Sequence, residues 1–334
     1  MADNPLLTLP HVEIDRLRVE EELRASVRAP TDALTEMASH LIGAGGKRVR
    51  PLFAIAAAAC GATSDEPASV DVVRGGVSVE LVHLGSLYHD DVIDEAVTRR
   101  GIESVNARWG NLRAILAGDF LLSRASEIAA SLGTEVAGLL AATIGRLCEG
   151  EVLELQDAYQ VSRTEEAYLA SIEGKTASLL SAACRIGAIV AGLPRPEIDR
   201  LTQFGRAYGM AFQIVDDVLD VVATDEQLGK PAGHDLVEGA YNLPVLRALA
   251  GPGGEELKAV LGTPIEGEAW ERARMLVRQG DAVDQSVEVA GRYVDEAIDL
   301  LRSFEDRPAA VALQGASRHL LDDLAAIRVA APGP

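Results

Sequence analysis

The stretch Leu87-Tyr88-His89-Asp90-Asp91-Val92-Ile93-Asp94 sets three aspartates within five residues of an otherwise apolar run. Successive residues of an α-helix are rotated by about 100°, so Asp90 and Asp94 project from one face a single turn apart, and Asp91 lies to the side. Carboxylates stacked in this way repel one another and destabilise an isolated helix unless a cation neutralises them. The stretch therefore predicts a helix that carries a cation site.

A second copy of the pattern stands at Asp216-Asp217-Val218-Leu219-Asp220, directly after the mostly apolar residues 210–215. Two such faces turned toward each other would form an oxygen-lined site that suits magnesium ions, which keep some waters and share a few carboxylates with substrate phosphates. The alternative is a pair of solvated acidic patches, since the chain is rich in acid. Aliphatic neighbours around both copies favour the metal site.

The periodicity of apolar residues is helical from end to end, and it predicts an all-α fold without strands. Gly and Pro clusters mark the breaks, and no linker divides the chain, so we expect one domain over residues 1–334. Its motif-bearing core spans about 45–246, followed by variable C-terminal helices at about 254–327. The predicted helices are 11–28, 31–43, 50–60, 67–95, 110–131, 134–158, 164–191, 196–222, 236–250, 267–280, 284–304 and 308–327.

Charge and cysteine content exclude several classes of protein. Lys and Arg number 31 against 51 Asp and Glu, for a net charge of −20 that opposes general affinity for nucleic acids or anionic membranes. The three cysteines (Cys60, Cys148 and Cys184) lie far apart and form no disulfide or zinc pattern. The N-terminal stretch lacks a basic segment followed by an apolar one, so we expect no secretion signal. No apolar run is long enough to span a bilayer. We expect a cytoplasmic protein with no transmembrane segment.

In so acidic a chain, clustered cations and polar groups near the aspartates stand out. Lys47 and Arg50 belong to a Gly-rich loop, Gly45–Pro51, whose free N–H groups could hold a diphosphate at a helix start. The other candidates are Arg99 and Arg100 after the first motif, His83 on the face of Asp90, Gln213 before Asp216, Lys175-Thr176 and Lys230. Each is a weak signal alone, since a basic loop is usually solvated and a lone histidine is usually structural. Jointly they predict two diphosphate sites around one metal cluster.

These residues resemble the trans-isoprenyl diphosphate synthases, or polyprenyl synthetases, over about residues 45–246. Six motifs occur in the family's order: GGKRVRP (45–51), ELVHLGSLYHDDVIDEAVTRRG (80–101), NARWGNLRAILAGDFLL (106–122), GKTASL (174–179), GMAFQIVDDVLD (209–220) and GKPAGHDL (229–236). The resemblance implies an all-α fold of ten or more helices around a deep central cavity, usually as a homodimer. It also implies transfer of isopentenyl diphosphate onto an allylic diphosphate, with both diphosphates as partners and three Mg²⁺ ions per active site.

The resemblance assigns roles to the candidates. Asp90, Asp94 and Asp216, supported by Asp220, would bind the magnesium ions. Arg99, Lys175 and Lys230 would contact the allylic diphosphate. Isopentenyl diphosphate would be bound by Lys47, Arg50, His83 and Arg100, and Thr176 and Gln213 would line the reacting centre.

The sequence departs from the family after GHDLVEG, where many members have Lys and then Thr two positions on. Here Ala240 and Asn242 stand at these positions, which removes one phosphate-facing cation. Two rivals remain open. A class I terpene cyclase usually has an Asn/Asp-Ser/Thr-Glu second motif, and a non-catalytic synthase subunit tends to lose its aspartates; this chain has two aspartate-rich motifs.

Product length is the remaining expectation. In the family, bulky aromatics four and five residues before the first aspartate close the cavity floor and stop growth at farnesyl or geranylgeranyl diphosphate. Gly85 and Ser86 occupy these positions here, so we expect a product longer than geranylgeranyl diphosphate, in the hexaprenyl-to-decaprenyl range. The alternatives are that the small residues only allow close helix packing, and that the enzyme makes short chains.

Overall fold

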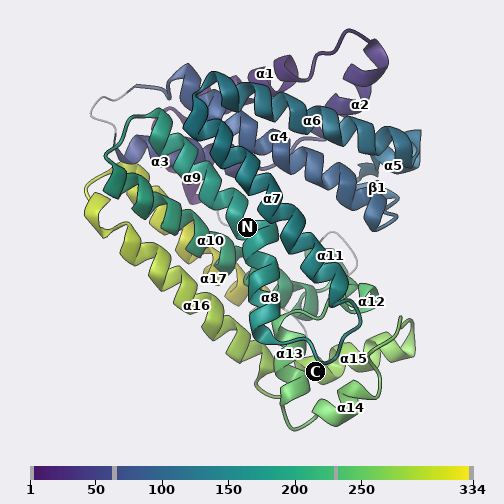
Figure 1. Cartoon of the computed structure of the whole chain (residues 1–334). Helices are drawn as coiled ribbons and strands as arrows, with labels where there is room; N and C mark the ends of the chain where they lie inside the picture. The colour runs from purple at the N-terminus through teal and green to yellow at the C-terminus, as the bar shows by residue number, and fades with distance from the viewer. Residues whose placement is uncertain (1–3, 62–65, 229–231, 331–334) are drawn as a thin grey trace.

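The computed structural model describes residues 4–61, 66–228 and 232–330. The described chain is predominantly helical with almost no sheet, which confirms the predicted all-α fold (Figure 1). Its longer helices are α1 (Val12–Ser26), α2 (Asp32–Gly43), α3 (Val49–Cys60), α4 (Val70–Ile93), α6 (Asn111–Ser131), α7 (Thr134–Gln156), α8 (Glu165–Ile172), α9 (Ser178–Val190), α10 (Arg195–Val222), α13 (Leu243–Ala250), α15 (Glu268–Arg278), α16 (Ala282–Leu300) and α17 (Pro308–Ala330). Shorter pieces are η1 (Pro5–Thr8), α5 (Val105–Trp109), η2 (Glu173–Ala177), α11 (Asp225–Leu228), α12 (His234–Glu238), α14 (Gly254–Lys258) and η3 (Arg302–Phe304).

Three of the predicted elements need correction. The helix expected at 164–191 contains a π-helical turn, η2, between α8 and α9. The helix expected at 236–250 is broken into α12 and α13, because Gly239 takes a left-handed φ of 73° and ends the first piece. The expectation of no strands is wrong after α4, where β1 (Thr98–Arg99) and β2 (Ile102–Glu103) pair antiparallel.

Small residues let the central helices approach closely. A Cβ atom at Gly187 of α9 would lie 2.0 Å from the carbonyl oxygen of Ala54 in α3. A Cβ atom at Gly76 of α4 would lie 2.9 Å from the Cα atom of Pro51, also in α3. Because no side chain fits at these crossings, α3, α4 and α9 pack backbone against backbone.

Two hydrophobic clusters form the core, and α10 joins them. Its first half, including Phe204 and Tyr208, packs with α3, α4, α6 and α9. Its second half, including Met210 and Ile214, packs with α13 and the later helices. Because one long helix contributes apolar side chains to both clusters, it fixes the second aspartate motif in the same rigid frame as α4.

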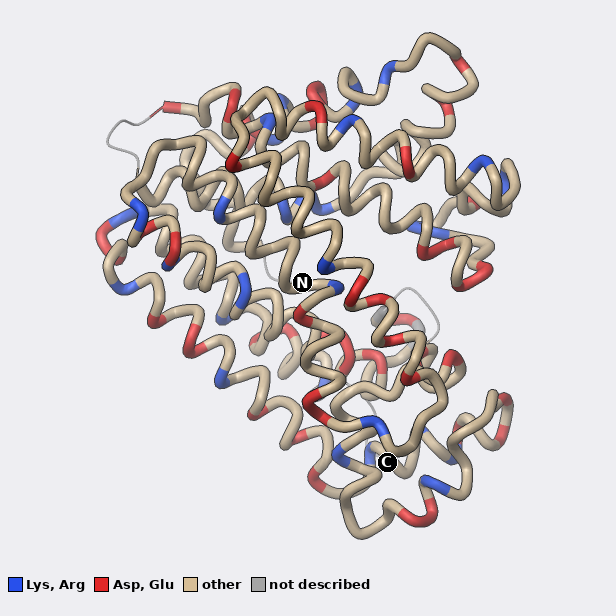
Figure 2. Tube along the Cα trace, viewed as in Figure 1, with Lys and Arg blue, Asp and Glu red and all other residues tan. Residues whose placement is uncertain are grey.

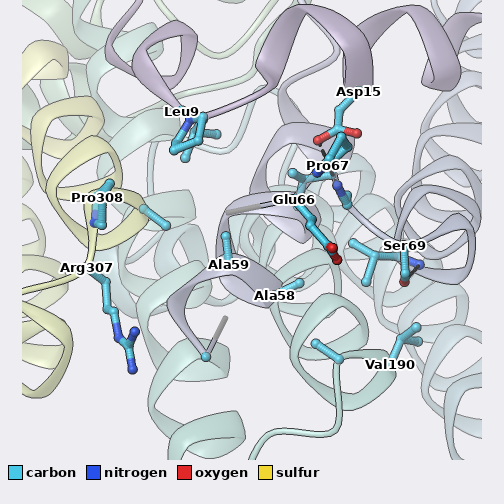
Figure 3. Close-up of a pocket in the computed structure, with 17 residues that line it drawn as sticks. Leu9, Asp15, Ala58, Ala59, Glu66, Pro67, Ser69, Val190, Arg307 and Pro308 are labelled. Atoms are coloured by element: carbon cyan, nitrogen blue, oxygen red, sulfur yellow. Dashed lines mark hydrogen bonds between the residues drawn. The ribbon is translucent and has the colours of Figure 1, made fainter. Parts of the chain in front are cut away.

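A large hollow lies at the end of the bundle opposite to the aspartates of α4. Its volume is about 820 Å³, and it lies between Leu9, the C-terminal end of α3, Val72 of α4 and Val190 of α9 (Figure 3). Val72 stands 18 residues before Asp90, which is about 27 Å along a helix. The hollow is therefore remote from the first motif. None of the described helices combines the length and apolar character needed to cross a bilayer.

Acidic residues are spread over the whole molecule. In Figure 2 red segments lie along most of the helices and outnumber the blue ones. Acidic residues also gather where α7, α8 and α12 come together (Figures 1 and 2). The distribution of charge alone therefore does not identify the site, and the contacts of individual side chains must do so.

Candidate active site

The first aspartate motif lies in the last turn of α4, where the chain turns into the β1–β2 hairpin. The side-chain amide of Asn106 donates to the carbonyl oxygens of Asp91 at 2.9 Å and Ala96 at 3.0 Å, which fixes this turn. The Asp91 carboxylate is fully buried and accepts a 2.6 Å hydrogen bond from Nε of Arg99. Asp91 thus holds the hairpin in place, and Asp90 and Asp94 remain for the open side of the helix.

Lys175 reaches the site because Gly150 of α7 and Gly174 of η2 let the two segments approach each other closely. A Cβ atom at Gly150 of α7 would lie 2.5 Å from the backbone nitrogen of Lys175, so only glycine fits there. The Lys175 ammonium then lies 2.8 Å from Glu151 and 2.7 Å from Glu154. Burial lowers the pKa of Lys175, but these two carboxylates outweigh it and raise the pKa overall, so the lysine stays charged.

The second motif is tied to η2 by a chain of hydrogen bonds. Thr176 Oγ1 donates to the side-chain oxygen of Gln213 at 2.7 Å, and the Gln213 amide donates to Asp217 at 2.8 Å. The phenol of Tyr168 donates to the other oxygen of Asp217 at 2.5 Å. Asp217 therefore orients Gln213. The sequence instead indicates Asp216 and Asp220, on either side of Asp217, as candidate metal ligands.

The remaining aspartates of the second motif differ from each other. Asp216 is exposed, and Asp220 is buried, where it accepts a 3.3 Å hydrogen bond from the backbone N–H of Asp235. The Asp235 carboxylate in turn accepts a 3.0 Å hydrogen bond from the side chain of Asn242. Asn242, at one of the two positions where the sequence departs from the family pattern, thus orients a further carboxylate beside the motif.

One cavity of about 170 Å³ gathers residues from both motifs and from η2. It is lined by Asp94, Glu154, Arg163, Tyr168, Ile172, Lys175, Thr176, Gln213, Asp217, Asp235, Glu238, Ala240 and Asn242. Burial raises the pKa of Asp90 to about 7, against the opposing effect of Lys175 and with further elevation from Glu151 and Asp94. Burial likewise raises the pKa of Asp217 to about 7 and that of Asp235 well above its usual range, and neighbouring aspartates add to both. Burial, with neighbouring carboxylates, thus disfavours the charged forms of all three aspartates.

These carboxylates fit a divalent-cation site that is completed by a ligand. Over residues 4–61, 66–228 and 232–330, no three His, Cys, Asp or Glu side chains are arranged to hold a metal ion by themselves. Magnesium takes only a few protein carboxylates and fills its shell with water and substrate phosphate oxygens. The donor set is all oxygen, and the raised pKa values show that added positive charge would stabilise it.

A separate cavity of about 340 Å³ collects the other predicted phosphate residues, Lys47, Arg50, His83 and Arg100. Burial lowers the pKa of His83 well below its usual range, and the charges of Arg50, Arg100, Arg99 and Arg48 lower it further. His83 is therefore neutral, and it lies among guanidinium groups. Positive charge concentrated in a chain with a net charge of −20 indicates an anion site.

The structure therefore brings together most, but not all, of the predicted site residues. Asp90, Asp216 and Asp220 line neither of the two cavities, although their sequence neighbours Asp94 and Asp217 line the acidic one. Arg99 also lines neither cavity, because its side chain turns back to Asp91. Lys230 lies outside the described residues. Sequence reasoning missed Glu151, Glu154 and Asp235; a spacing of three residues puts the two glutamates on one helix face, but many acidic pairs in this chain share that spacing.

Comparisons with known proteins identify the family of this chain. A sequence model of the polyprenyl synthetase family matches residues 31–274. The chain is 42% identical over 291 residues to heptaprenyl diphosphate synthase component 2 of Geobacillus stearothermophilus, covering 86% of this chain and 89% of the relative. It is 38% identical over 299 residues to the nonaprenyl diphosphate synthase of Mycobacterium tuberculosis, covering 89% and 88%.

The fold has solved relatives as well. The crystal structure of a polyprenyl synthase from Caulobacter crescentus, complexed with calcium and isoprenyl diphosphate, superposes with a TM-score of 0.85 at 34% identity. That alignment covers 92% of this chain and 94% of the solved one. The two aspartate motifs, the cation-lined cavity and these similarities together place the chain in the polyprenyl synthetase family of prenyltransferases.

Proposed function

We propose that this enzyme transfers isopentenyl diphosphate onto an allylic prenyl diphosphate and repeats the step to make a trans-polyprenyl diphosphate. The observation that carries the proposal is the pair of cavities along α4, one lined by Lys47, Arg50 and Arg100 and the other by acidic residues and Lys175. His83 lines the first cavity, and Asp90 lies one helical turn before Asp94, which lines the second. His83 and Asp90 are seven residues and therefore about 10 Å apart along α4. Two diphosphates bound there would lie side by side.

The carboxylates proposed to hold magnesium are Asp90, Asp94 and Asp216, with Asp220 in support and three ions per site. Bound magnesium would withdraw charge from the allylic diphosphate and make it a better leaving group. The Caulobacter synthase is complexed with calcium, which supports a divalent cation in such a site, and the hard oxygen donors of this chain support magnesium.

The protein's own groups would direct the rest of the reaction. Lys175, Arg99 and Lys230 are proposed to bind the allylic diphosphate and to stabilise it as its C–O bond breaks. The oxygens of Thr176 and Gln213 would face the allylic cation, which the isopentenyl double bond attacks. The new cation then loses a proton, for which the released diphosphate is the proposed acceptor. The buried surroundings exclude water that would quench the cation.

A product longer than geranylgeranyl diphosphate is supported by the relatives' names and by the shape of α4. A Cβ atom at Gly85 would lie 3.1 Å from the carbonyl oxygen of Gly118 in α6, so this glycine serves helix packing. Ser86 is partly exposed, and its hydroxyl donates back to the carbonyl of His83 at 2.9 Å. We propose that the growing chain passes Ser86, whose small side chain leaves room for it.

A homodimer is the proposed assembly. Large apolar side chains stand exposed on α6 and α7, among them Leu112 at 80%, Leu116 at 63% and Val152 at 50% exposure. Such a face is typical of a protein interface. The name "component 2" of the Geobacillus relative raises a separate partner subunit as the competing assembly.

All three cysteines are free, which supports a reducing, cytoplasmic setting. The long helix α10 contributes to both hydrophobic clusters, which supports a single domain.

Incubation of the purified chain with labelled isopentenyl diphosphate, an allylic diphosphate and magnesium tests the proposed reaction. The expected result is an extended prenyl diphosphate that is absent with EDTA and returns with added magnesium. A cyclic hydrocarbon formed from the allylic substrate alone would instead identify a terpene cyclase. Activity that appears only with a second protein would identify a subunit of a heteromeric synthase.

A further inference from the structure

Arg48 belongs to the same basic loop as Lys47 and Arg50, yet it lies differently. Its residue is only 4% exposed, whereas Lys47 is exposed and Arg50 is half-buried. It takes a left-handed φ of 48° at the residue before α3, a conformation that L-residues adopt only when their surroundings hold them there. The side chain is therefore directed into the protein at the back of the cation-lined cavity.

The whole Arg48 guanidinium is occupied by the protein. Nε and Nη2 form a two-pronged pair with Glu20 of α1 at 2.5 and 3.3 Å. Nη1 lies 3.3 Å from Glu80 of α4, and Nη2 also donates to the carbonyl oxygen of Ile42 at 3.1 Å. A guanidinium with its donors used in this way has little left for a bound diphosphate.

The same guanidinium shapes the loop that faces the ligand. A Cβ atom at Gly46 would lie 2.9 Å from Nη1 of Arg100 and 3.0 Å from Nη1 of Arg48. Arg100 also donates to the carbonyl oxygens of Leu41 and Gly45. The Gly45–Gly46 turn thus packs directly against the guanidinium groups of Arg48 and Arg100.

Glu80 is the only carboxylate among the described residues that line this cavity. It is 2% exposed, and its Oε2 atom has no hydrogen-bond partner in the described structure. Its charge favours the protonated forms of Arg50 and Arg100, which burial opposes. Glu80 therefore offsets the mutual repulsion of the guanidinium groups of Arg48, Arg50 and Arg100.

We infer that Arg48, Glu20 and Glu80 are positioning residues, which hold the loop and leave Lys47, Arg50 and Arg100 to bind isopentenyl diphosphate. The inference rests on the proposed function. It extends the site beyond the motif-bearing region, since Glu20 comes from α1 at the N-terminus.

Separate Michaelis constants for the two substrates test the inference in Arg48→Lys, which keeps the charge but loses the planar fork. We expect KM for isopentenyl diphosphate to rise about tenfold, with kcat and KM for the allylic substrate within about twofold. Glu20→Gln should shift the same constant in the same direction. The matched control is Arg74→Gln. Arg74 of α4 pairs with Glu22 of α1 at 3.3 Å, so it joins the two helices that Arg48 also bridges, but it does so outside the cavity.

Equal shifts in both Michaelis constants, or none in that for isopentenyl diphosphate, would overturn the inference. If Arg48→Lys does not fold, Glu20→Gln alone decides between these outcomes. Calorimetric binding of inorganic pyrophosphate without magnesium separates the inference from the proposed reaction. Weaker binding in Arg48→Lys than in wild type supports positioning even if no prenyl product forms, and equal binding contradicts it.

Discussion

Thr176 and Gln213 stand 37 residues apart in the chain, and their side chains meet in a 2.7 Å hydrogen bond. The contact joins the π-helical turn that carries Lys175 to the helix that carries the second aspartate motif. A π-helical turn inserts one extra residue into a helix and is frequent at functional sites. Here it turns Thr176 toward α10 and Lys175 toward α7 at the same time.

The aspartates are expected to control turnover. Asp90→Asn and Asp216→Asn each remove a carboxylate that should share the magnesium ions, so kcat should fall by about 100-fold or more. Circular dichroism should show unchanged helix content. Asp306→Asn, an exposed aspartate far along the chain, is the control and should retain full activity. Activity within a few-fold of wild type in both motif variants would rule out the metal cluster.

The cation-lined cavity should serve one substrate only. Lys47→Ala and Arg50→Ala should raise KM for isopentenyl diphosphate more than KM for the allylic substrate. Each lost charge-assisted contact is worth about 1.5–3 kcal/mol, or about tenfold to a hundredfold in affinity. Steady-state kinetics with one substrate varied at a time measures this split. Equal effects on both substrates would mean that the two sites are assigned wrongly.

The acidic cavity should make the stability of the ligand-free protein depend on pH. Burial raises the pKa of Asp90 from 3.8 to about 7, so between these values the folded protein binds more protons than the unfolded chain. Stability should therefore fall as the pH rises through this range. In EDTA, Asp90→Asn should gain in Tm relative to wild type as the pH is raised from about 4 to about 8. A Tm difference that does not change with pH would contradict the raised pKa.

Two neighbouring positions on α4 should separate product length from packing. Ser86→Phe should shorten the product while early condensations continue, because the ring fills the proposed path without touching the aspartates. Gly85→Ala should lower Tm and leave the product length unchanged, because its methyl group would press on Gly118 of α6. Chromatography of the products, with thermal melts of both variants, measures the two effects. An unchanged product from Ser86→Phe would exclude this path.

The exposed face of α6 and α7 should carry the dimer contact. Leu116→Asp places a charge on this face and should convert a dimer into a monomer, measured by light scattering after size-exclusion chromatography. Leu17→Asp, at a similarly exposed leucine of α1, should leave the mass unchanged. A wild-type monomer would turn attention to a separate partner subunit.

The all-α fold could be predicted from helical periodicity, and the aspartate motifs could be predicted because charge recurs in apolar surroundings. The break between α12 and α13 could not, since Gly239 lies within a helical pattern and only its left-handed φ ends the helix. The partners of Lys175 and Asp220 escaped prediction for another reason. Glu151, Glu154 and Asp235 come from distant segments, and only the folded chain shows which of its many acidic residues converge.

The contact of Arg99 is a further example of a pairing between segments that only the folded chain shows. The place of Arg99 after the first motif predicts a phosphate-binding cation, and the structure adds a partner that the sequence does not indicate, the carboxylate of Asp91. Asp91 is the member of the motif that helical geometry sets to the side of Asp90 and Asp94. Helical periodicity could place the Asp91 carboxylate away from the proposed metal face. It could not predict the β1–β2 hairpin, which brings Arg99 back to Asp91.

Product analysis of the wild-type enzyme tests the central claim most directly. The purified chain is incubated with farnesyl diphosphate, labelled isopentenyl diphosphate and magnesium, and the products are dephosphorylated and separated by chain length. We predict a ladder of trans-prenyl products that ends between hexaprenyl and decaprenyl and is absent with EDTA. A product that stops at geranylgeranyl diphosphate would contradict the open path along α4, and no incorporation of isopentenyl diphosphate would contradict the proposed reaction itself.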